Sequence, residues 1–252
     1  MFVSACGQTI VSEKVSDEES EADTTVIDSS ETQVSPALPA VNNEHFDKAH
    51  KLMDNYQYEE AEKEFLLAID ELKSSGVADS EACMAIVKHD LGHFYLKMER
   101  YSDAYDYLLS SYVGLRDIYG EDSEHVLLYK TSICLYDMSI GNYDTALASL
   151  LEINEKVLSD EGKTQTTNLI GNVYLNMGDY DKAEAWLKDA LAYANKTDYD
   201  TDEIYNDLGG LYMISGRNNE ALKCFLSAEK IAQSKGNGVQ EISITLLWLI
   251  WR

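Results

Sequence analysis

Two histidines one helical turn apart are the residues with the clearest potential for chemistry. His89 and His93 are four positions apart, so in a helix both side chains lie on one face and could share a transition metal. A metalloprotease motif needs a glutamate between them, and the residues there are Asp90, Leu91 and Gly92. We therefore expect no metal at this pair, although protonation near about pH 6 could make it pH-sensitive.

Other catalytic signatures are missing from the sequence. No glycine-rich phosphate loop follows a strand, because the sequence has no convincing strand pattern, and there is no nucleophile elbow. The four cysteines are far apart, whereas zinc and redox motifs need short spacings. Cys134 and Cys224 stand among apolar residues at helical spacing, which is typical of small buried side chains. We expect neither enzyme activity nor a cofactor.

The composition indicates an acidic and helical protein. The 252 residues include 45 Asp and Glu against 20 Lys and Arg, a formal net charge of −25. Such a surface repels phosphate, which argues against nucleic acid and favours a protein or peptide partner with a neutral or basic surface. There are only two prolines, which break helix interiors. No run of about 18 apolar residues is present, so the sequence predicts no membrane span.

The first 42 residues differ in composition from the remainder. Residues 8–42 hold eight acidic residues, one lysine and both prolines, without apolar periodicity, so we expect a disordered acidic linker. Residues 1–7 resemble the lipobox of bacterial lipoproteins, which implies lipidation of Cys6 and an anchor at the cell envelope. Only five residues precede Cys6, fewer than a signal needs, so either the start is truncated or the match is chance. A cytoplasmic regulatory or assembly module is the alternative.

From residue 43 onward a short phrase recurs. It has an aromatic residue, two mostly polar residues and an alanine, as in Tyr180-Asp181-Lys182-Ala183. Counted from each alanine, the residue twelve earlier is small and the residue four later is large, which lets two antiparallel helices approach closely. The pattern predicts five repeats at 43–76, 85–118, 127–159, 164–196 and 202–235. The five alanines are Ala61, Ala104, Ala146, Ala183 and Ala221.

These repeats resemble the tetratricopeptide repeat family. The copies from Ile170 to Ala183 and from Leu208 to Ala221 match best, and the long spacings in the first half resemble the kinesin-light-chain-like subclass. The resemblance implies an all-α, right-handed α-solenoid of five antiparallel helix pairs over residues 43–252 that binds a protein or peptide. Residues 239–252 look like the start of a sixth helix or a capping helix, through truncation or as a docking surface.

In this family the first helix of each pair lines the concave binding groove. Each first helix here has two positions four apart that should point away from its partner helix. The asparagines among them could hydrogen-bond a peptide backbone or could be solvated surface residues. The basic residues of the family's carboxylate clamp are missing from this face. The predicted groove positions are Phe46, His50, His89, His93, Thr131, Leu135, Asn168, Asn172, Asn206 and Gly210.

Overall fold

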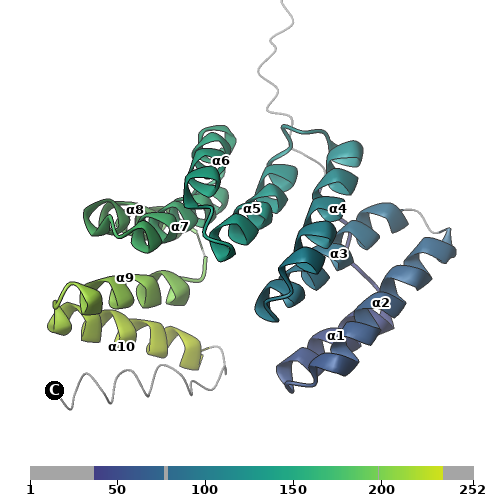
Figure 1. The fold of residues 1–252 in the computed structure, drawn as a ribbon, viewed down its shortest axis with the longest axis horizontal. Helices are drawn as coiled ribbons and strands as arrows, with labels where there is room; N and C mark the ends of the chain where they lie inside the picture. The colour runs from purple at the N-terminus through teal and green to yellow at the C-terminus, as the bar shows by residue number, and fades with distance from the viewer. Residues whose placement is uncertain (1–36, 77–78, 198, 235–252) are drawn as a thin grey trace, which may run out of the picture. The chain divides into compact units, whose positions relative to one another are not determined.

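A computed structural model describes residues 37–76, 79–197 and 199–234, and every regular element in these ranges is an α-helix. The helices follow one another as antiparallel pairs, each pair packed on the next (Figure 1). This confirms the predicted all-α solenoid of five helix pairs. The helices are α1 (Glu44–Asp54), α2 (Tyr58–Ser75), α3 (Ser80–Lys97), α4 (Tyr101–Tyr119), α5 (Glu124–Ser139), α6 (Tyr143–Lys156), α7 (Asp160–Met177), α8 (Tyr180–Ala194), α9 (Asp202–Ile214) and α10 (Asn218–Ser234).

Inside each helix pair, the small residue twelve positions before the repeat alanine packs against the large residue four positions after it. A Cβ atom added to Gly92 would lie 2.6 Å from Leu108, and one added to Gly171 would lie 2.8 Å from Leu187. The same holds for Gly209, where the nearest atom of Phe225 would be 2.7 Å away. Distances this short leave no room for a methyl group, so the first helix of each pair needs a small residue there.

The turn inside each pair uses a left-handed residue. Gly141, Gly178 and Gly216 have φ of 83°, 80° and 74°, and the first two repeats place Tyr56 (φ 61°) and Glu99 (φ 56°) there. In each of these turns two backbone amides bond back into the first helix, which satisfies carbonyls at its end. A side chain in this conformation costs about 1–2 kcal/mol that glycine avoids. Repeats one and two therefore carry local strain that the others lack.

Three first helices begin earlier than the repeats predicted from sequence. α3 begins at Ser80 rather than near residue 85, α5 at Glu124 rather than near 127, and α7 at Asp160 rather than near 164. The added turns are packed: Ala82 and Cys83 of α3 are buried, as is Val126 of α5. The repeat phrase does not extend to these turns, which explains why the periodicity did not reveal them.

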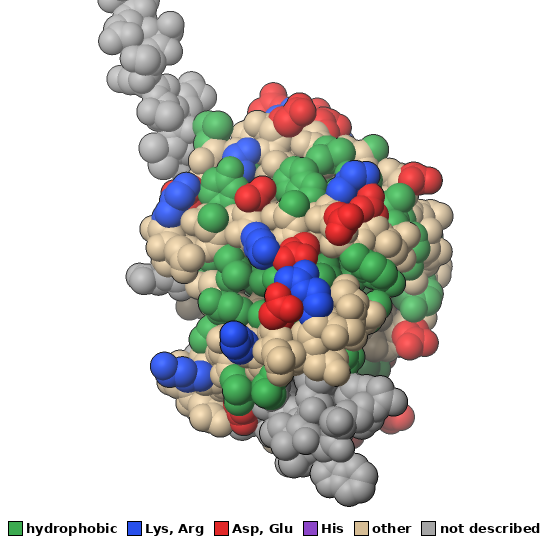
Figure 2. Space-filling model, turned by 90° about the vertical axis from the view of Figure 1, so that its left-hand side faces the viewer, with side chains coloured by type: hydrophobic (Ala, Val, Ile, Leu, Met, Phe, Trp, Pro, Cys, Tyr) green, Lys and Arg blue, Asp and Glu red, His purple; other side chains and the backbone are tan. Residues whose placement is uncertain are grey.

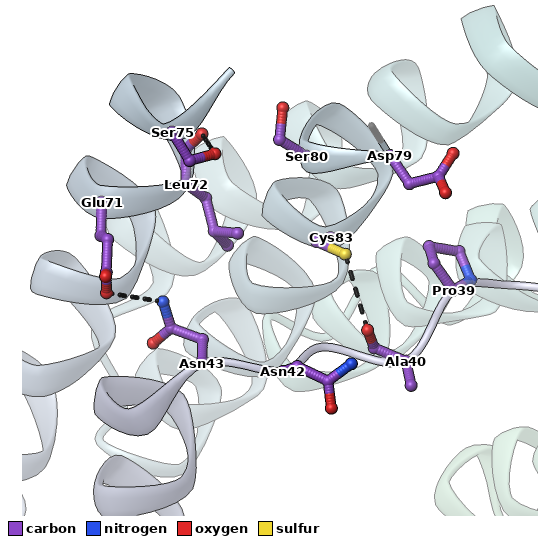
Figure 3. Close-up of a pocket in the computed structure, with 10 residues that line it drawn as sticks. All are labelled: Pro39, Ala40, Asn42, Asn43, Glu71, Leu72, Ser75, Asp79, Ser80 and Cys83. Carbon is purple, nitrogen blue, oxygen red and sulfur yellow. Dashed lines mark hydrogen bonds between the residues drawn. The ribbon is translucent and has the colours of Figure 1, made fainter. Parts of the chain in front are cut away.

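The segment before α1 packs on the helices. Leu38 contacts the core cluster around Leu115, and Val41 contacts the cluster around Phe65. Figure 3 shows this segment beside a cavity of about 440 Å³, where the Cys83 thiol points at the Ala40 carbonyl at 3.8 Å. The predicted boundary between linker and solenoid at residues 42 and 43 therefore falls inside a packed segment. The remainder of the predicted linker, the lipobox and residues 239–252 lie outside the described residues.

The same charged cluster joins repeats one and two and repeats four and five. Glu184 accepts hydrogen bonds from the Tyr212 hydroxyl at 3.0 Å and from Arg217 at 2.6 Å, and the guanidinium lies 4.2 Å from the Tyr212 ring centre. Glu62, Tyr95 and Arg100 make the equivalent contacts at 2.8 Å, 2.8 Å and 4.3 Å. We call each of these a Glu–Tyr–Arg clasp. It fixes the second helix of one repeat to the first helix of the next.

Candidate functional site

The predicted groove residues lie on the first-helix face, the surface formed by α1, α3, α5, α7 and α9. On this face, contacts between neighbouring repeats follow a fixed register. The residue eleven positions before the alanine of one repeat bonds to the residue fourteen positions before the alanine of the next repeat. His50 Nε2 lies 3.1 Å from Asp90 Oδ2, His93 Nε2 lies 2.8 Å from Ser132 Oγ, and Asn172 Nδ2 lies 2.7 Å from Asp207 Oδ2. We call this series the inter-repeat ladder. The sequence predicted that these side chains point away from their partner helices, and neighbouring first helices partly cover several of them.

The first half of the ladder is a histidine cluster. His89 Nε2 lies 2.8 Å from Ser132 Oγ and 3.2 Å from His93 Nε2, while His89 Nδ1 lies 3.2 Å from Asp90 Oδ1. The His89 ring also packs on Tyr129, with ring centres 4.3 Å apart. The cluster therefore joins α1, α3 and α5 through one carboxylate, three imidazoles and one hydroxyl.

Burial and charge set the protonation states in this cluster. Burial opposes ionisation of Asp90, but hydrogen bonds from His50 and His89 outweigh it and lower its pKa to about 2. Burial and the nearby His89 lower the pKa of His93 to about 4, so His93 is neutral at pH 7. The hydrogen bond to Asp90 raises the pKa of His50 above its usual value. The ionised Asp90 thus accepts hydrogen bonds from His50 Nε2–H and from His89 Nδ1–H, and the second bond fixes the orientation of the His89 ring.

A hydroxyl shared by two imidazoles must donate to one and accept from the other. His89 gives its Nδ1 hydrogen to Asp90, so in the neutral ring Nε2 accepts from the Ser132 hydroxyl. His93 Nε2–H then donates to the same oxygen. This assignment follows from the hydrogen-bond network, since each group then has one matching partner.

Asp90, His89 and Ser132 stand in the order of a hydrolase triad. A working triad needs a reachable nucleophile and N–H groups that stabilise an oxyanion. Ser132 is 3% exposed and lies within α5, where the backbone amides are used by the helix. The arrangement therefore fits a structural hydrogen-bond network better than a nucleophilic centre. In the described part of the chain, no three His, Cys, Asp or Glu side chains converge to hold a metal ion.

The ladder is interrupted between repeats three and four. Leu135 and Leu169 hold its two positions there, and neither offers a hydrogen bond. Thr131, expected on the exposed face, is completely buried. Its hydroxyl donates to the Leu128 carbonyl at 2.6 Å and accepts from Gln165 at 3.4 Å. The hydroxyl is thus satisfied by the backbone of its own helix. Because Thr131 is also completely buried, a partner cannot reach it in this conformation.

Asparagines surround a buried carboxylate in the second half of the ladder. Asp207 accepts hydrogen bonds from Asn172 and Asn168 of α7, and burial raises its pKa to about 6. The carbonyl oxygens Oδ1 of Asn168 and Asn206 are buried and have no hydrogen-bond partner. An unsatisfied buried acceptor costs about 1–3 kcal/mol, so this part of the face is incomplete by itself.

The remaining predicted residues lie at the edges of the face. Phe46 and His50 stack edge to face with ring centres 4.6 Å apart, and His50 also contacts Phe65. Gly210 has open space where a side chain would be. The structure therefore brings the histidines together in one group and the asparagines in another, while Thr131 belongs to neither.

The partners of these residues were missed in the sequence. Asp90, Ser132 and Asp207 all stand fourteen residues before their repeat alanine, where repeat one has Asp47 and repeat four has Leu169. Four of the five residues in this column are short and polar. That polar column, which directly follows the first of the two predicted groove positions in each repeat, was the available signal.

Charges on the surface are mixed rather than separated. On the face shown in Figure 2, Lys and Arg side chains of the described residues lie close to Asp and Glu side chains and form no continuous basic patch. Among the described helices, none is long and apolar enough to cross a membrane.

Comparison with known proteins agrees with this geometry. Residues 162–234 match the model of the tetratricopeptide repeat family. Over 133 residues the chain is 26% identical to human protein O-mannosyl-transferase TMTC2, a stretch that covers 50% of this chain and 15% of that relative. The chain thus spans about 15% of the length of the curated relative that it matches.

Solved structures are similar in fold. TTC0263, a tetratricopeptide repeat protein of Thermus thermophilus, has 20% identity and a TM-score of 0.57, covering 82% of this chain and 98% of that one. The TPR-like repeats of a candidate kinesin light chain from Podosopora anserina have 16% identity and a TM-score of 0.53, covering 77% and 95%. A Rap protein crystallised with competence and sporulation factor has 14% identity and a TM-score of 0.62, covering 75% and 53%.

The paired helices and the contacts between successive first helices define an α-solenoid with a protein-interaction scaffold fold. Residues 162–234 match the tetratricopeptide repeat family, and the described repeats before them have the fold of solved tetratricopeptide repeat structures.

Proposed function

We propose that this chain is a non-catalytic scaffold that binds a protein or peptide on its first-helix face. The observation that carries the proposal is the pair of unpartnered carbonyl oxygens on Asn168 and Asn206. A peptide backbone offers an N–H group at nearly every residue, so a bound chain would supply the missing donors, without being read for sequence, once these partly exposed amides turn their oxygens toward it. The Rap protein with a similar fold was crystallised with a bound factor, which supports the same use of the fold here.

Affinity capture with the full chain tests this proposal. The test variant carries Asn168→Ala, Asn172→Ala and Asn206→Ala together, and the matched control carries Asn195→Ala, Asn218→Ala and Asn219→Ala, all exposed. We expect partners to be captured by the wild type and by the control, and to be reduced at least about tenfold with the test variant. Circular dichroism verifies that both variants are helical. Equal capture by both variants would show that the asparagine face is not the binding surface.

We further propose that the protein is anchored by lipid at the bacterial cell envelope through Cys6. The residues Val3 to Gly7 support this proposal by their resemblance to a lipobox, and they lie outside the described residues. Metabolic labelling with an alkyne fatty acid, in a bacterium that carries the gene with its native upstream region, tests it. We expect label on the wild type and none on Cys6→Ser. A wild-type protein without label that fractionates with the cytoplasm would favour the cytoplasmic alternative.

A further inference from the structure

Two aspartates of the inter-repeat ladder hold the same register position in opposite surroundings. Asp90 on α3 contacts the imidazoles of His50 and His89, and the hydrogen bond with Asp90 raises the pKa of His50, which favours its positively charged form. Asp207 on α9 receives hydrogen bonds only from the uncharged amides of Asn172 and Asn168. Among the described residues, no Lys, Arg or His forms an ion pair with Asp207. Asp207 is therefore a largely buried carboxylate without a counter-ion.

The surroundings make this lone carboxylate costly. Burial raises the pKa of Asp207, and the nearby carboxylate of Glu203 raises it further. By contrast, the hydrogen bonds from two histidines lower the pKa of Asp90 despite its burial. A charge held out of water without an opposite charge is destabilising, and such groups in proteins are usually paired. The two halves of the ladder thus differ in whether the chain itself supplies the cation.

Two further acceptors lie on the same pair of helices. Asn168 holds in repeat four the position that Asn206 holds in repeat five, and Oδ1 of each is buried without a partner. Asn168 also contacts Asp207 directly. The first helices α7 and α9 therefore hold one partly exposed carboxylate and two covered amide oxygens that lack donors, and the two amides must turn to meet an approaching group. An approaching group must supply both hydrogen-bond donors and positive charge to satisfy all three.

We propose that Asp207, with the amide oxygens of Asn168 and Asn206, binds a basic group of a peptide partner, namely a lysine or arginine side chain or an N-terminal ammonium. The inference rests on the proposed function and specifies the chemistry of the ligand. An ammonium carries three N–H donors and a guanidinium five, whereas a backbone amide carries one donor and no charge. The formal charge of −25 favours the approach of such a partner from solution.

Selection from a phage-displayed library of random dodecamer peptides, with the immobilised full chain as target, tests the proposal. Three targets are compared: the wild type, Asp207→Asn and Glu203→Gln. Asparagine is nearly isosteric with aspartate and keeps an acceptor for Asn172, so this variant should fold. Glu203→Gln removes the same charge from an exposed site one turn earlier on α9, so it is the matched control.

We expect peptides selected on the wild type and on Glu203→Gln to be enriched in Lys and Arg, and this enrichment to vanish on Asp207→Asn. A selected peptide should bind Asp207→Asn about tenfold to a hundredfold more weakly. Enriched peptides without a basic preference, or with equal affinity for Asp207→Asn, would overturn the inference and leave the proposed function standing. If no target enriches any sequence, the proposed function fails and the inference fails with it.

A divalent cation is the other ligand that carboxylate and amide oxygens suit. Its contribution is measured by titrating the wild type with calcium chloride at constant ionic strength while recording the side-chain amide NMR signals of Asn168, Asn172 and Asn206. We expect no saturable change. A saturable shift that Asp207→Asn abolishes would assign the site to a metal ion and overturn the inference.

Discussion

Asn172 donates from Nδ2 to Asp207 Oδ2 over 2.7 Å, in the same register in which His93 meets Ser132. One backbone geometry thus brings together a residue eleven before one repeat alanine and a residue fourteen before the next. The side chains at these positions determine whether the polar atoms of the contact are all hydrogen-bonded. With histidines the network is closed, because no buried side-chain N or O of His50, His89, His93, Asp90 or Ser132 lacks a partner. With asparagines it stays open, because two carbonyl oxygens have none.

Replacement of Asp207 by asparagine is expected to stabilise the protein at neutral pH. The folded-state pKa of about 6 lies above the usual value near 3.8, so the folded state holds a proton that the unfolded state releases between these pH values. Stability therefore falls as pH rises from about 4 to about 6. Asp207→Asn should add about 1–3 kcal/mol at pH 7 and little at about pH 4.

Urea unfolding followed by circular dichroism at the two pH values measures this difference. Asp189→Asn, which removes one negative charge from an exposed site on α8, is the control and should change stability by less than about 0.5 kcal/mol. An Asp207→Asn protein that is less stable than the wild type at pH 7 would contradict the description of an uncompensated carboxylate.

His93 is expected to make the protein sensitive to mild acid. Its folded-state pKa of about 4 lies below the usual 6.5, because burial and His89 disfavour the charged ring. The unfolded chain therefore binds a proton between these pH values that the folded chain does not, and stability falls as pH decreases from about 6.5 to about 4. The loss should approach about 2–3 kcal/mol. His50 and Asp207 act in the opposite sense, because their pKa values are raised, and both are unchanged in the variant below.

Comparison with His93→Gln isolates this contribution. Glutamine can still donate to Ser132 but does not titrate, so the free energy of unfolding of His93→Gln should rise relative to that of the wild type as pH falls from about 6.5 to about 4. Urea midpoints over this range provide the measurement. Parallel curves for the two proteins would show that His93 does not titrate in this window.

The helix pairs could be predicted from sequence because their determinants are local and repeated. Gly92, Gly171 and Gly209 are each followed sixteen residues later by a large side chain, and both members of each contact lie in one repeat. Close approach needs only the sizes of these residues, and size is visible in sequence. The early start of α3 was missed because Ala82 and Cys83 pack without belonging to the repeated phrase.

The binding face was predicted less well, because its residues contact partners that are far away in the sequence. Helical spacing placed Asn172 and His93 on the first-helix face, but their partners Asp207 and Ser132 are 35 and 39 residues away. Which side chains of neighbouring repeats meet depends on the offset between repeats, and the spacing of one helix does not contain that offset. Thr131 shows the same limit, since its position on one face did not reveal that neighbouring helices bury it.

The Glu–Tyr–Arg clasp is expected to stabilise the junction between repeats four and five. Arg217, Lys188 and Tyr212 donate to Glu184, whose side chain is 18% exposed and whose pKa falls to about 2, chiefly through Arg217. Glu184→Gln should lower the free energy of unfolding by about 1–2 kcal/mol at pH 7. Glu220→Gln removes a carboxylate that is 46% exposed from the same arginine and should cost less than about 0.5 kcal/mol. Equal losses in thermal or urea unfolding would show that burial of Glu184 adds nothing.

Glu99 is expected to be a position where glycine stabilises the fold. Its φ of 56° is the conformation that Gly178 adopts with φ of 80° in the equivalent turn. Relief of the left-handed strain, about 1–2 kcal/mol, exceeds the entropy that glycine loses on folding, about 0.5–1 kcal/mol. Glu99→Gly should therefore stabilise by about 0.5–1 kcal/mol, and Gly178→Ala should destabilise by a similar amount or more. Thermal unfolding midpoints check both, and a destabilised Glu99→Gly protein would contradict the strain argument.

Two glycines on first helices offer a matched test of the close approach inside each pair. A Cβ at Gly171 would lie 2.8 Å from Leu187, whereas a Cβ at Gly210 would meet nothing within 4 Å. Alanine favours a helix interior over glycine by about 0.8–1.0 kcal/mol at either position. At Gly171 the clash should outweigh this gain and give a net loss of about 1–3 kcal/mol, because Leu187 is completely buried and has little room to move. Gly210→Ala should instead stabilise the protein by up to about 1 kcal/mol. Urea unfolding of both variants decides the question: if both substitutions stabilise, contact between small and large residues does not set the distance between α7 and α8.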